Sequence, residues 1–137
     1  MGRMRFILFY LLGGLAAVGA QVAVDPDSTV PLVGASGAIA AVLGGYILLY
    51  PRARVLTVVF IIFFFTFVEI PAVIVLGVWL ALQFLPAVGQ LGSSELGDQG
   101  GVAYFAHIGG FIFGLALISL FAKRKSRRYD QPRYPVY

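Results

Sequence analysis

Long apolar blocks alternate with short polar segments along this chain, and the pattern predicts four membrane spans. We place the spans at about residues 6–24, 36–50, 70–86 and 102–122. Such blocks are typical of helices that face lipid, because a helix needs roughly 20 apolar residues to cross a bilayer. The predicted fold is an all-α, polytopic bundle of membrane helices formed by residues 1–122. The basic segment 123–137 is predicted to be a disordered tail.

The apolar stretch from Val55 to Leu85 is too long for one perpendicular span, and it contains Glu69 and Pro71. Proline favours the first turn of a helix, and glutamate favours the N-terminal end. We therefore expect the third spanning helix to begin near residue 70. The segment 55–68 would then lie along the inner interface or dip into it, which keeps Glu69 near water. The alternative is one tilted helix with a buried glutamate.

The N-terminal segment is similar to a signal peptide, because Arg3 and Arg5 precede an apolar run and small residues. The apolar run continues to about Val24, so we interpret it as a retained membrane span. The loop between residues 91 and 101 is rich in Gly and Ser, and we expect it to be mobile.

Composition and charge agree with a membrane protein. The chain is 60% hydrophobic and only 12% charged, which is too little to build the charged shell of a soluble domain. Its ten Lys and Arg residues lie before the first span, after the second and after the fourth. The positive-inside rule therefore predicts cytoplasmic termini. Basic residues that flank apolar blocks indicate topology and argue against nucleic-acid binding. The absence of cysteine excludes disulfides and thiol chemistry.

Ser36 and His107 are predicted to lie at the same depth in the membrane. Ser36 precedes Arg52 by 16 residues, and His107, the only histidine, precedes Lys123 by 16 residues. At 1.5 Å per residue each lies roughly 24 Å above the inner charges. In an apolar core of about 30 Å both sit a few ångströms below the outer surface.

The chemistry of these two side chains fits a catalytic pair. A serine hydroxyl becomes a good nucleophile when a base takes its proton, and imidazole is the usual base near neutral pH. In the sequence Gly34-Ala35-Ser36-Gly37, the backbone N–H groups of a helix start can stabilise an oxyanion. No Asp or Glu is placed to orient His107, so the prediction is a dyad. We expect no metal and no cofactor.

Small residues predict close contact between the second and fourth spans, which would bring the pair together. Taken alone, each motif has a simpler interpretation: glycine and serine are common where helices pack, and a lone histidine can bond a neighbouring helix. The small residues are Gly37, Ala40, Ala41 and Gly44 in the second span, and Gly110 and Gly114 in the fourth.

From about Arg3 to Phe121 the sequence resembles the rhomboid family of intramembrane serine proteases. The resemblance rests on the motifs 34–37 and 106–110, on Gly114, and on the segments 51–55 and 69–72. It implies proteolysis of membrane-anchored proteins in a prokaryotic plasma membrane. It also implies that Ser36 is the nucleophile, and that His107 acts as general base and then as general acid.

The chain departs from the family pattern in two respects. Family members normally have six or more spans, so this sequence resembles a rhomboid-like core lacking the first two transmembrane helices. In the family the second of those helices carries a His and an Asn that assist the oxyanion hole, whereas this chain has one His and no Asn. Some members also have an aromatic residue where this chain has Ala40. The expected partners are transmembrane substrates, the lipid bilayer and those N-terminal spans.

Two other functions stay open at this point. A non-catalytic rhomboid-like protein would bind client transmembrane helices without cutting them. A small transporter or channel subunit is disfavoured, because ion and proton paths usually contain intramembrane charges.

Overall fold

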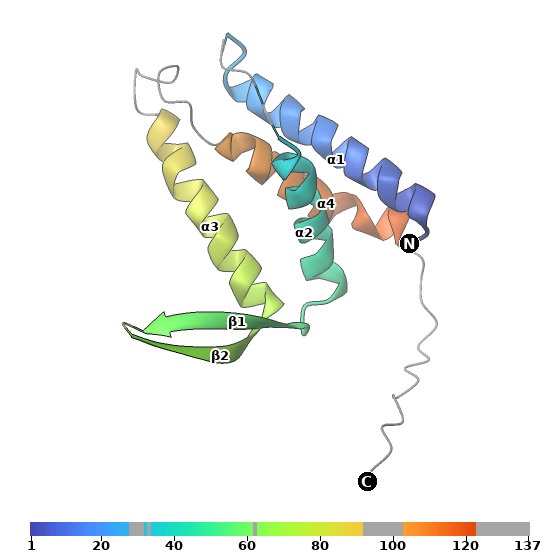
Figure 1. Cartoon of the computed structure of the whole chain (residues 1–137). Coiled ribbons are helices and arrows are strands. Elements are labelled where there is room, and N and C mark those ends of the chain that lie inside the picture. Colours follow the sequence, from blue (N-terminus) through green and yellow to red (C-terminus); the bar gives the residue numbers. More distant parts are fainter. Residues whose placement is uncertain (28–31, 33, 62, 92–102, 123–137) are drawn as a thin grey trace.

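The computed structural model describes residues 1–27, 32, 34–61, 63–91 and 103–122. It is a helical bundle with a β-hairpin at one end (Figure 1). This confirms the prediction of an all-α membrane bundle. Most of the predicted loop and the predicted basic tail fall outside the described residues. The elements are α1 (Arg3–Val24), α2 (Ser36–Leu49), β1 (Arg54–Ile61), β2 (Phe64–Pro71), α3 (Ala72–Leu91) and α4 (Tyr104–Phe121).

Three of these helices are long and apolar enough to cross a membrane, over Arg3–Val24, Ala72–Gly89 and Tyr104–Phe121. The apolar helix α2 has only 14 residues, which corresponds to about 21 Å. It packs against α1 and α4, and the face that it buries is built from small residues. The buried residues of α2 are Gly37, Ala38, Ala40, Ala41, Gly44 and Gly45.

The backbones of α2 and α4 are in direct contact at glycines. A Cβ atom added to Gly110 would overlap the carbonyl oxygen of Gly37, and one added to Gly114 would overlap the carbonyl oxygen of Ala41. Gly44 lies in the same way against the carbonyl oxygen of Phe111. Any larger residue would force the helices apart, so these glycines set the distance between α2 and α4.

The hairpin of β1 and β2 is a feature that the sequence analysis did not predict. Its strands pair antiparallel from Arg54 opposite Pro71 to Ile61 opposite Phe64. Val, Ile, Thr and Phe dominate both strands, and these are the residues that favour strands. The alternative of one long tilted helix is therefore wrong. Nη1 of Arg54 forms an ion pair with Oε2 of Glu69 at 3.3 Å, and both side chains are largely exposed.

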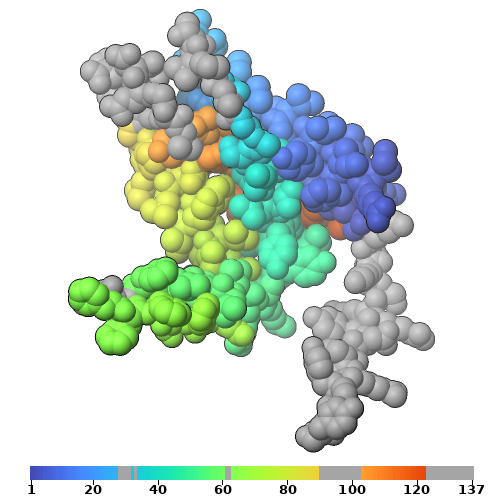
Figure 2. Space-filling view, viewed as in Figure 1, coloured from blue at the N-terminus to red at the C-terminus, as the bar shows by residue number. Residues whose placement is uncertain are grey.

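Helix α3 begins at Ala72, two residues after the predicted start, and continues to Leu91, past the predicted end at residue 86. Pro86 lies inside it, and membrane helices tolerate proline where the backbone finds other partners. Figures 1 and 2 show α3 and the hairpin to one side of α1 and α2. Most of the described side chains of α3 are exposed or only half-buried, so this helix is joined to the bundle by few contacts.

Candidate active site

Ser36 is the first residue of α2, and the chain reaches it through a turn at Gly34. Gly34 has φ of +109°, a value that residues with a side chain rarely adopt. The first helical hydrogen bond in α2 runs from the N–H of Ile39 to the carbonyl of Ala35. The N–H groups of Ser36 and Gly37 thus precede the hydrogen-bonded turns, at the positive end of the helix dipole.

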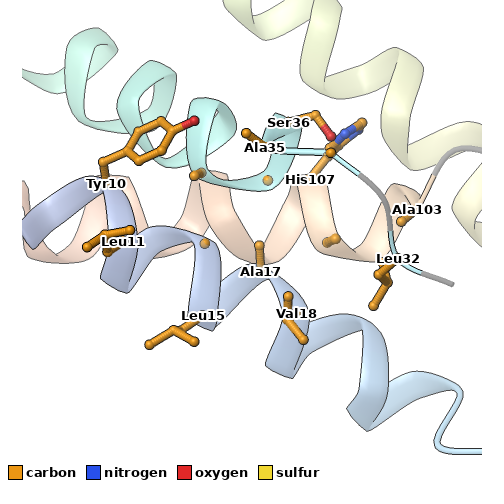
Figure 3. Close-up of a pocket in the computed structure, with 15 residues that line it drawn as sticks. Tyr10, Leu11, Leu15, Ala17, Val18, Leu32, Ala35, Ser36, Ala103 and His107 are labelled. Carbon is orange, nitrogen blue, oxygen red and sulfur yellow. The ribbon is translucent and has the colours of Figure 1, made fainter. Parts of the chain in front are cut away.

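His107 lies in the first turn of α4, and only 8% of its surface is exposed. A pocket of about 500 Å³ lies between the starts of α2 and α4 and one face of α1, and both Ser36 and His107 line it. Figure 3 shows the hydroxyl of Ser36 pointing toward the imidazole of His107. The other lining residues are Tyr10, Leu11, Gly14, Leu15, Ala17, Val18, Leu32, Gly34, Ala35, Gly37, Ala38, Ala103 and Ala106.

The pocket is mostly apolar, and its described lining contains no Asp, Glu, Lys or Arg. Between Ser36 and His107, both of which the structure describes, there is no hydrogen bond. Catalytic hydrogen bonds are often long without substrate and tighten when it binds. The arrangement therefore brings a hydroxyl and an imidazole to the wall of one cavity.

Two residues of α3 that the sequence analysis did not single out contact the histidine. Oε1 of Gln83 lies 2.9 Å from Nδ1 of His107. The ring of Trp79 lies 5.8 Å from the imidazole, centre to centre, and 6.1 Å from the ring of Phe111. One feature of the sequence could have pointed to Gln83. It is the single side-chain amide in the apolar segment 72–89, and it follows Trp79, the only tryptophan, by one helical turn.

The start of α4 is also tied to the end of α1. Oε1 of Gln21 accepts a hydrogen bond from the N–H of Ala106 at 3.2 Å. This N–H lies in the first turn of α4, where backbone donors lack helical partners. On the other side of the site, Ala40 is fully buried. The aromatic ring that packs on His107 comes instead from Trp79 of α3.

Apolar helices of spanning length, packed around a serine and a histidine in one cavity, define an integral membrane protein with a candidate hydrolytic site. The Rhomboid domain family model matches residues 1–124, and the chain belongs to the rhomboid family. Members of this family are generally intramembrane serine proteases. No curated protein and no solved structure gives a match.

Proposed function

We propose that this protein is an intramembrane serine endopeptidase that cleaves membrane-anchored proteins with Ser36 and His107. The observation that carries the proposal is that these two side chains line one pocket and that the hydroxyl points toward the ring (Figure 3). Depth supports it: α2 covers about 21 Å of an apolar layer of about 30 Å. With the end of α2 at the inner boundary, Ser36 lies below the outer surface, where a transmembrane substrate can reach it.

In the proposed reaction, His107 takes the hydroxyl proton of Ser36 while Oγ attacks the scissile carbonyl carbon. The tetrahedral intermediate collapses when the protonated imidazole gives this proton to the leaving amine, which leaves an acyl-enzyme. Water then attacks the ester carbonyl while His107 accepts a proton from it. The collapse of the second intermediate returns a proton to Oγ and releases the carboxylic acid product.

The negative oxygen of each intermediate needs hydrogen-bond donors. The N–H groups at the start of α2, in the segment Gly34-Ala35-Ser36-Gly37, are suited to this role because they precede the first helical bond. One oxyanion donor typically contributes about 10²–10³ in rate. We propose that two further spans, such as family members normally have, supply the remaining donors as partners of this domain.

We also propose that both termini face the cytoplasm of a prokaryotic cell. The start of α1 and the end of α4 lie at the same end of the bundle (Figure 1), and the rings of Phe9 and Phe121 lie 5.3 Å apart, centre to centre. Arg3 and Arg5 stand at this end, and the positive-inside rule places such residues in the cytoplasm.

The test is covalent labelling of the purified protein with a fluorophosphonate, which reacts with activated serines. We expect the parent to be labelled and Ser36→Ala and His107→Ala to lose the label. The matched control is Ser119→Ala, which removes an exposed hydroxyl near the other end of α4 and should leave labelling unchanged. Equal labelling of Ser36→Ala and the parent would show that Ser36 is not the nucleophile.

A second candidate function is non-catalytic binding of client transmembrane helices. It is favoured by the single His and the absence of Asn in the chain, which leave no match for the His and Asn that assist the oxyanion hole in the family. It predicts that client proteins co-purify equally with the parent and with Ser36→Ala, and that neither protein reacts with the fluorophosphonate.

A further inference from the structure

The ring of His107 has two nitrogens, and one of them already has a partner. Nδ1 lies 2.9 Å from Oε1 of Gln83. A carbonyl oxygen accepts hydrogen bonds and cannot donate them, so Nδ1 must carry the proton in this arrangement. In a neutral imidazole only one nitrogen is protonated. The contact therefore leaves Nε2 with a free electron pair.

A second residue of α3, Trp79, contacts the same imidazole as Gln83. Trp79 precedes Gln83 by four residues, so both side chains lie on one face of α3. The Trp79 ring contacts both the imidazole of His107 and the ring of Phe111. Phe111 follows His107 by one turn of α4 and is 1% exposed. The amide of Gln83 and the ring of Trp79 thus both contact the imidazole from the side of α3.

We infer that Gln83 is a positioning residue that selects the tautomer of His107 with a proton on Nδ1. Nε2 is then the base that accepts the hydroxyl proton of Ser36. In soluble serine proteases a buried carboxylate performs this task. A neutral amide suits an apolar membrane interior better, because it orients the ring without the cost of burying a charge. The role in catalysis rests on the proposed function, whereas the tautomer depends only on the contact between Gln83 and the ring.

The tautomer can be measured without any substrate. His107 is the only histidine, so ¹⁵N-histidine labelling of the full chain, purified without a histidine tag, gives signals from one ring. The spectrum is recorded at a pH where this ring is neutral, and the chemical shifts tell which nitrogen holds the proton. We expect Nδ1 to be protonated in the parent. We expect the proton to shift largely to Nε2, the nitrogen that free histidine prefers, in Gln83→Leu.

The matched control is Gln21→Leu, the same substitution at a glutamine that bonds the backbone of Ala106 and does not touch the ring. It should leave the proton on Nδ1. Gln83→Glu keeps an acceptor oxygen and should also leave it there. A parent ring with its proton on Nε2 would overturn the inference, as would a Gln83→Leu ring that keeps its proton on Nδ1. The spectrum of the parent tests the protonation of Nδ1 even if Gln83→Leu does not fold.

Activity gives the second readout. Residues that hydrogen-bond a metal-binding histidine typically contribute about 10- to 100-fold to activity. We expect a loss of similar size in kcat for Gln83→Leu, with KM nearly unchanged. Gln83→Glu should restore most of the rate. If kcat is the same in Gln83→Leu and the parent, Gln83 does not act through His107. If the parent shows no fluorophosphonate labelling but has its proton on Nδ1, the proposed function fails and the tautomer assignment stands.

Discussion

The two contacts that α4 makes with its neighbours α2 and α3 are built in different ways. Toward α2, the backbones touch at Gly110 and Gly114, where no side chain intervenes. Toward α3, the described contacts with His107 and Phe111 run through the ends of two long side chains, those of Trp79 and Gln83.

The two kinds of contact meet two different requirements of the candidate site, namely the position and the orientation of His107. The backbone contact fixes where Ser36 and the start of α4 lie, because closely packed interiors leave no room for adjustment. The side-chain contact fixes how the imidazole is turned, and a rotamer change is enough to alter it. Position and orientation of the same histidine therefore depend on different helices.

The strongest test of the backbone contact is Gly114→Ala. The added methyl group would overlap the carbonyl oxygen of Ala41, so α2 and α4 must move apart. Overpacking of this kind typically costs about 1–3 kcal/mol and occasionally more. We expect a loss in that range, together with loss of fluorophosphonate labelling. The stability change is measured by unfolding in mixed detergent micelles.

Gly77→Ala is the matched control, because a Cβ atom at Gly77 has no neighbour within 4 Å. Alanine is favoured over glycine inside a helix by roughly 0.5–1 kcal/mol, so this variant should be as stable as the parent or slightly more so. If both variants lost the same stability, close approach of α2 and α4 would not be the cause.

Removal of the ring that joins α3 to α4 should have a smaller effect on stability. Aromatic pairs contribute about 0.5–1.5 kcal/mol beyond their burial, and Trp79 is only half-buried. We expect Trp79→Ala to lower the free energy of unfolding by about 1–2 kcal/mol and to lower kcat. Trp79→Phe should recover part of both. The same unfolding assay and substrate kinetics measure these changes. A normal kcat in a destabilised Trp79→Ala protein would contradict a role for the ring in orienting His107.

The smallest effect is expected within the hairpin. Arg54 and Glu69 form an ion pair whose side chains are 69% and 58% exposed. Exposed pairs contribute about 0–1 kcal/mol. A double-mutant cycle of Arg54→Ala and Glu69→Ala should give a coupling energy of at most about 0.5 kcal/mol, lower still in high salt. A coupling above about 1 kcal/mol would mean that the hairpin is held far more firmly than its exposure indicates.

The helices were predictable from the sequence because long apolar runs have few alternatives in lipid. The hairpin was missed for a physical reason. Its turn around Phe63 has no Gly, Asn or Asp to mark it, and a run of Val, Ile and Phe fits a strand as well as an interfacial segment. The start of α3 was close to its predicted place because Glu69 and Pro71 mark a break in the apolar pattern.

The sequence predicted only part of the candidate site. Ser36 and His107 stand out because they are polar groups in apolar segments, with glycine one residue after Ser36 and two residues after His107. Gln83 lies 24 residues before His107, and no spacing rule connects them. Their contact depends on the angle at which α3 crosses α4. Packing between the helices sets this angle, and the local sequence pattern does not.

The shortness of α2 has a consequence for hydration. Hydrolysis consumes one water for each bond cut, and that water has to enter an apolar layer. With its last residues at the inner boundary, α2 leaves roughly 9 Å of a layer of about 30 Å between Ser36 and the outer surface. Water therefore crosses only about a third of this apolar layer to reach the hydroxyl. A short central helix thus brings the aqueous phase close to the candidate nucleophile, Ser36, whose side chain is exposed at the start of α2.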